Sequence, residues 1–163
     1  MKLHISRFAL IVLVVSACIA NAADLAPIVA KGFTHAMDNK KIPYTVEARQ
    51  GPYKAPATSV KPAFGTNGGK LTPKFICTGL TVSIGGKKME IPDKAFGDLC
   101  DITLIKPPVF EMGYWLLPIK GGHDAGAYEV EYMFNDKRVL ERGYLMNVPG
   151  PKWLRTLWQH DKF

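Results

Sequence analysis

Short stretches of alternating apolar and polar residues in the second half of the chain constrain its fold more than any other feature. Residues 128–134 place Glu129 and Glu131 on one face of a strand and four large apolar side chains on the other: Tyr128, Val130, Tyr132 and Phe134. Because successive side chains of a strand point to opposite faces of a sheet, this pattern indicates a half-buried strand. Asn135-Asp136 and the returning stretch 139–145 complete a hairpin.

A second hairpin is predicted earlier in the chain, where Gly85-Gly86 separates two further apolar stretches. Its first strand carries Leu80, Val82 and Ile84 on one face, and Met89 and Ile91 return after the turn. Strands at intervals of roughly ten residues, with turns between them, predict an antiparallel sheet or a sandwich of hairpins.

Three more strands are expected around these hairpins. Residues 42–48 alternate, and we place this strand at a sheet edge because Pro43 cannot donate a ladder hydrogen bond. Residues 101–105 form a strand that ends before Pro107-Pro108, and residues 110–119 form one continuous buried strand.

The register of the last hairpin stays open at this point. A two-residue turn opposes Glu129 to Arg142, whereas a four-residue turn opposes Glu131 to Arg142. Both are favourable cross-strand pairs, and both place Arg142 on the solvated face.

Helical spacing of apolar residues occurs in three places. Residues 23–39 predict a short helix, although Gly32 weakens it, and 92–99 predict one helical turn with Asp93 as N-cap. After Pro151, apolar residues recur at i, i+1, i+4 and i+5 and predict a short amphipathic helix. These residues are Trp153, Leu154, Leu157 and Trp158.

The chain is therefore expected to be a β-rich α+β domain. Residues 1–22 are expected to be a signal peptide, 23–74 form an N-terminal segment, and 75–163 form the β-rich core with the C-terminal helix. We take 23–163 as one domain, because its length is ordinary for a single core. Residues 50–74 carry proline and glycine without an apolar period and are expected to form a long loop or extended arm.

The N-terminus has the pattern of a secretory signal. Lys2 and Arg7 precede an uncharged apolar run at 8–20, and Ala20-Asn21-Ala22 is a small-residue cleavage site. The run is too short to span a bilayer, so we expect a periplasmic or secreted protein. Val15-Ser16-Ala17-Cys18 also resembles a lipobox, so lipidation at Cys18 is the alternative.

Only Cys77 and Cys100 remain after cleavage at this site. Two cysteines in an oxidising compartment most simply form a disulfide with each other. A free nucleophilic cysteine is the rival interpretation, but neither residue has His or Arg next to it in sequence to lower a thiol pKa.

The formal net charge of +7 modestly favours an acidic partner or a membrane surface. The basic residues are scattered along the sequence, and an exported protein does not normally meet nucleic acid, so no nucleic-acid partner is expected.

No residue pattern points to a catalytic site, a cofactor or a metal. His35, His123 and His160 lack metal-ligand spacing, and the few serines lie in no hydrolase motif. Glu129 and Glu131 share a strand face but alternate with core residues, so we expect them to face water.

The candidate binding residues are instead His123 and Asp124, in the glycine-flanked turn 121–126, and Trp153 and Trp158. The long loop 50–74 is the other candidate. The expected function is that of an exported bacterial envelope protein acting as a non-enzymatic binding module, similar in class to inhibitor or immunity proteins. Its partner would be another envelope protein or a cell-wall component, and membrane contact is expected only if Cys18 is lipidated.

Two alternatives remain from the sequence. One is a structural envelope lipoprotein anchored through Cys18. The other is a hydrolase whose zinc-binding or carboxylate residues converge only in three dimensions.

Overall fold

A computed structural model describes residues 25–36, 38–54, 71–146 and 152–154. The predicted signal, Cys18, most of the long loop, Trp158 and His160 lie outside these residues. Within them, no helix is both long and apolar enough to cross a membrane.

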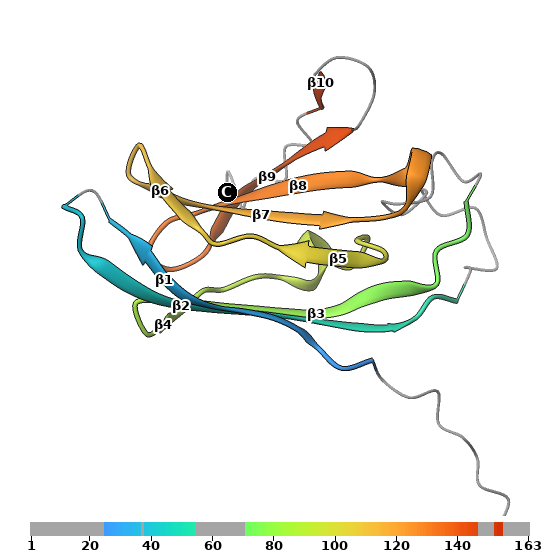
Figure 1. Ribbon diagram of the computed structural model, residues 1–163, viewed down its shortest axis with the longest axis horizontal. Coiled ribbons are helices and arrows are strands. Elements are labelled where there is room, and N and C mark those ends of the chain that lie inside the picture. The colour runs from blue at the N-terminus through green and yellow to red at the C-terminus, as the bar shows by residue number, and fades with distance from the viewer. Residues whose placement is uncertain (1–24, 37, 55–70, 147–151, 155–163) are drawn as a thin grey trace, which may run out of the picture.

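The described residues form two antiparallel sheets that face each other, the first below and the second above in Figure 1. The first sheet has the order β1-β2-β3-β4, with β1 (Ile28–His35), β2 (Lys41–Pro52), β3 (Phe75–Ile84) and β4 (Lys87–Lys88). The second has the order β10-β9-β8-β7-β5, and β6 also pairs with β7. Its strands are β5 (Ile102–Ile105), β6 (Val109–Glu111), β7 (Tyr114–Gly121), β8 (Tyr128–Phe134), β9 (Val139–Met146) and β10 (Lys152–Leu154).

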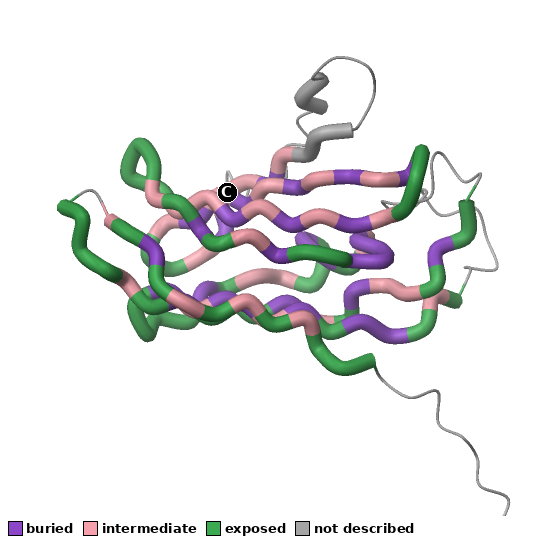
Figure 2. The backbone as a smooth tube through the Cα atoms, viewed as in Figure 1, coloured by how far each residue is buried: buried purple, intermediate pink, exposed green. Residues whose placement is uncertain are grey.

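One hydrophobic core fills the space between the sheets, and buried residues alternate with exposed or half-buried ones along the strands (Figure 2). Both predicted hairpins contribute to it as expected: β3 through Leu80, Val82 and Ile84, and β8 through Tyr128, Val130, Tyr132 and Phe134. The antiparallel β architecture predicted from alternation is therefore confirmed.

The predicted helix at 23–39 is wrong, because residues 28–35 form β1 and pair along their whole length with β2. The helical spacing of Leu25, Ile28 and Val29 was coincidental: Ile28 packs against the core, whereas Val29 faces solvent.

The predicted edge position of 42–48 is also wrong, since β2 lies between β1 and β3. Proline is tolerated there because the β3 ladder begins only at Tyr44. The Pro43 carbonyl accepts a hydrogen bond from the turn amide of Gly85, at 2.8 Å. The missing N–H therefore costs no ladder bond to β3.

Residues 110–119 are not one strand but parts of β6 and β7. Met112 and Gly113 separate them in a tight turn, with φ of 49° and 86°. The glycine at this left-handed position was the available sequence signal for the turn.

Two short 3-10 turns are the only helical segments among the described residues, η1 (Asp93–Ala95) and η2 (Asp124–Gly126). The predicted turn at 92–99 is confirmed, and Ala95, Phe96 and Leu99 are buried. Pro92 rather than Asp93 occupies the N-cap position. The predicted C-terminal helix is wrong for residues 152–154, which form β10 and pair with β9.

Candidate functional site

One end of the sandwich brings together both predicted binding loops, and Asp101 holds them there. Its buried carboxylate accepts hydrogen bonds from the backbone amides of Lys74, at 3.1 Å, and Phe75, at 2.9 Å. Its carbonyl accepts a further bond, at 3.0 Å, from the amide of Gly122. The end of the 50–74 segment and the 121–126 turn are thus fixed to a single residue.

Gln50 fixes the beginning of the same segment. Its side-chain amide donates to the Ile102 carbonyl at 3.1 Å and accepts from the Ile102 amide at 2.7 Å. Ile102 pairs with Gly121 at the start of the turn. The Tyr53 amide also donates to the Lys74 carbonyl, at 2.9 Å, so both ends of the long segment lie beside the turn. We call this region the loop end.

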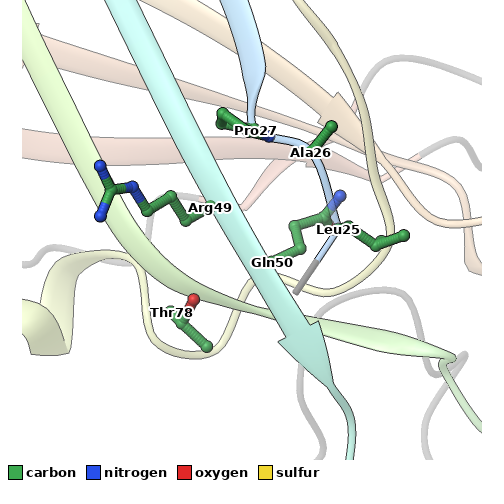
Figure 3. A pocket seen from close by; sticks show the side chains of 6 residues that line it. All are labelled: Leu25, Ala26, Pro27, Arg49, Gln50 and Thr78. Atoms are coloured by element: carbon green, nitrogen blue, oxygen red, sulfur yellow. The ribbon is translucent and has the colours of Figure 1, made fainter. Parts of the chain in front are cut away.

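A cavity of about 340 Å³ opens at the loop end, between the segment before β1 and the β2–β3 ladder (Figure 3). The ladder register shifts between Arg49 and Gln50, where β1 no longer pairs with β2. The cavity lining combines apolar and polar residues: Leu25, Ala26, Pro27, Arg49, Gln50 and Thr78. Arg49 supplies the one charge of this lining, and its guanidinium already bonds Glu47 at 2.7 Å, so the cavity suits a polar group.

His123 and Asp124 are exposed on the turn, as predicted. Asp124 has a φ of 47°, and a Cβ at Gly122 would collide with the Gly126 carbonyl, so glycine is required there. The Gly126 amide donates to the His123 carbonyl at 2.8 Å, which keeps the imidazole at the tip of a closed turn.

The other candidate residues do not join the loop end. His35 lies seven residues along β1 from Ile28, towards the opposite end of the sandwich. Trp153 lies in β10 opposite Leu145, while Trp158 and His160 fall outside the described residues. Across the described part of the chain, no three His, Cys, Asp or Glu side chains are placed to hold a metal ion.

The predicted disulfide is absent, because Cys77 and Cys100 are buried free thiols. Burial raises the pKa of Cys77 to about 11. Burial, followed by the charges of Asp101 and Asp98, raises the pKa of Cys100 to about 12. Both thiols are therefore protonated at neutral pH and are poor nucleophiles.

Glu129 and Glu131 share the outer face of the second sheet, as predicted, but neither opposes Arg142. Burial opposes ionisation of Glu129, yet hydrogen bonds and charges from Lys106 and Lys120 outweigh it and lower its pKa. Burial, helped by the charges of Glu111 and Glu129, raises the pKa of Glu131. The two carboxylates thus differ in environment, and no hydrogen-bonded nucleophile accompanies them among the described residues.

Arg142 lies inside the molecule, opposite Tyr132, because a register shift at Met133/Phe134 reverses the alternation of β9. Its side chain is 4% exposed and binds both Asp98 oxygens, at 2.6 and 2.9 Å, and the Ala95 carbonyl, at 2.6 Å. Tyr132 donates to the same Ala95 carbonyl at 2.7 Å, and Tyr128 donates to the Cys100 carbonyl at 2.8 Å. This network fastens 95–100 to the second sheet and is structural.

Comparison of the chain with family models, with curated proteins and with solved structures found no match.

Proposed function

We propose that this chain is an exported, non-enzymatic binding module of a bacterial envelope, located in the periplasm or secreted. The partner is another envelope protein or a cell-wall component. The observation that supports this proposal is the convergence of the 121–126 turn with both ends of the 50–74 segment, beside a cavity lined by Arg49. Binding residues are commonly carried by loops that a rigid scaffold positions, and two loops fixed to Asp101 have this arrangement.

The test is co-sedimentation of the purified protein with isolated envelopes and with purified cell-wall sacculi. His123→Ala and a variant with residues 56–69 replaced by a short Gly-Ser linker should each lose binding, with an unchanged thermal midpoint. Lys137→Ala, an exposed change at the β8–β9 turn, is the control and should bind normally. Binding by both loop-end variants equal to that of the wild type would overturn the proposal.

A lipid-anchored form is the second candidate, favoured by the Val15-Ser16-Ala17-Cys18 sequence. Intact mass of the native protein from separated soluble and membrane fractions decides between the two. A soluble species that begins at Ala23 supports the free module, and a membrane species that begins at a lipidated Cys18 supports the anchored form.

A further inference from the structure

The outer face of the first sheet carries a row of four polar side chains across all four strands. The registers align Lys31 with Thr45, Thr45 with Ser83, and Ser83 with Lys88. The row therefore has a lysine at each end and two hydroxyl groups between them. Phe33, His35 and Lys41 lie on the same face next to the row and are exposed.

Apart from Arg49, the cations of this face have no acidic partner among the described residues. Glu47 is the one acidic residue that the strands of the first sheet place here, and Arg49 already bonds it at 2.7 Å. Within the described residues, no carboxylate lies within ion-pairing distance of Lys31, Lys41 or Lys88. The face therefore presents positive charge to solvent.

We propose that this face binds an acidic polysaccharide, a linear glycan that carries carboxylate or phosphate groups. Strands in a sheet lie about 4.8 Å apart, so the backbones at Lys31 and Lys88 are about 14 Å apart. The two lysines stand at opposite ends of the row, so their charges are spread along it rather than gathered at one point. They fit a chain in which negative charge repeats, with the hydroxyls of Thr45 and Ser83 bonding the groups between.

Phe33 favours a glycan over other polyanions. Phe33 is 66% exposed and lies within β1, opposite Pro43, rather than in a turn. A ring in this position can stack on the apolar face of a sugar, whereas membrane insertion requires apolar side chains that project beyond the charged surface. The inference adds a second binding surface, separate from the loop end, and rests on the proposed function only for its setting in an envelope.

The experiment measures binding of polygalacturonate to the full mature chain by calorimetry over a series of salt concentrations, with neutral dextran as the uncharged control. The wild type should bind polygalacturonate more weakly as salt rises and should not bind dextran. The double variant Lys31→Gln with Lys88→Gln should weaken binding at least tenfold. Lys94→Gln with Lys137→Gln removes the same charge from exposed sites elsewhere and should weaken binding less than about twofold.

Phe33→Ala separates sugar contact from charge alone, and it should weaken binding of polygalacturonate but not of inorganic polyphosphate. Equal losses of affinity in the two double-lysine variants would show that only the net charge of the protein matters, and this would overturn the proposal. Tighter binding of single-stranded DNA or of anionic phospholipid vesicles than of polygalacturonate would overturn the choice of a glycan. His123→Ala leaves this face unchanged, so it should bind polygalacturonate as the wild type does. The same variant should lose the envelope binding assigned to the loop end, so each proposal can fail without the other.

Discussion

On the outer face of the first sheet, Lys31 and Lys88 extend into solvent with no carboxylate within bonding distance among the described residues. On the outer face of the second sheet, Lys106 and Lys120 both bond Glu129, at 2.6 and 3.2 Å. The second sheet also carries more acidic residues on its outer face: Glu111, Glu129, Glu131 and Glu141. Apart from the Arg49–Glu47 pair, the first sheet therefore leaves its outer charges without a partner among the described residues, whereas the second sheet bonds Lys106 and Lys120 within the chain.

This difference separates two uses of charge. A charge bonded within the chain has already exchanged water for a protein partner, and removing it leaves that partner unsatisfied. A charge that faces only water contributes little to folding and can attract a ligand. Changes in the second sheet should therefore alter stability, whereas changes on the first sheet should alter binding.

The largest effect is expected at Arg142. Arg142→Ala removes both hydrogen bonds to the Asp98 carboxylate and one of the two donors to the Ala95 carbonyl, and it deletes a buried side chain. We expect the free energy of unfolding to fall by about 2 to 4 kcal/mol. Urea denaturation measures it. Arg49→Ala is the matched control, because that arginine is 71% exposed, and it should change stability by less than about 0.5 kcal/mol. Similar losses of stability in Arg142→Ala and Arg49→Ala would contradict the distinction between charges bonded within the chain and charges that face solvent.

A smaller loss is expected when one buried hydroxyl of the same network is removed. Tyr132→Phe deletes one of the two donors to the Ala95 carbonyl and keeps the aromatic ring, and we expect a loss of about 1 kcal/mol. Tyr114→Phe removes an exposed hydroxyl from the same sheet and should leave the urea midpoint unchanged. If Tyr132→Phe is also neutral, the Tyr132 hydroxyl contributes nothing to holding Ala95, and the Arg142 bonds do.

Arg142 also shows where prediction from the sequence stops. Alternation identified the inward face of β8, because that signal lies within one strand. The position of Arg142 depends on the register shift at Met133/Phe134, and each regular register that the turn allowed placed the arginine outside. A bulge adds one residue and leaves no mark in the apolar pattern.

The loop end, too, could be predicted only in part from the sequence. The glycines around His123 identified an exposed turn, and proline and glycine marked the long segment. Nothing local indicated that Asp101 would join them, because its hydrogen bonds reach residues 74, 75 and 122, far from it in the sequence. The predicted disulfide rested on cysteine count and compartment alone, and these do not decide whether two thiols bond; in the structure Cys77 and Cys100 are free.

The contributions of Glu129 and Glu131 on β8 to the free energy of unfolding should change with pH in opposite directions. The lowered pKa of Glu129 means that its ionised form stabilises the fold above the ordinary glutamate pKa of about 4.3, and this contribution is lost as pH falls through the lowered value. The raised pKa of Glu131 means that ionisation destabilises the fold as pH rises from the ordinary value through the raised one.

At pH 7, Glu129→Gln should therefore lower the free energy of unfolding by about 0.5 to 1 kcal/mol, and Glu131→Gln should raise it by about a few tenths. Thermal unfolding from pH 3 to pH 8 measures both, and the two differences should shrink as the wild-type carboxylates become protonated. Differences of the same sign at pH 7 would show that the lysines do not distinguish the two residues.

The smallest effect on stability is expected where the proposed ligand binds. Lys31 and Lys88 are exposed and form no ion pair with a described residue, so Lys31→Gln with Lys88→Gln should change the free energy of unfolding by less than about 0.5 kcal/mol. Reduced repulsion from Lys41 would if anything make the change favourable, and most visibly at low salt. A clear loss of stability in urea denaturation would mean that these lysines bond within the chain as Lys106 and Lys120 do. Unchanged stability together with lost glycan binding is the combination that assigns the two sheets different uses of charge.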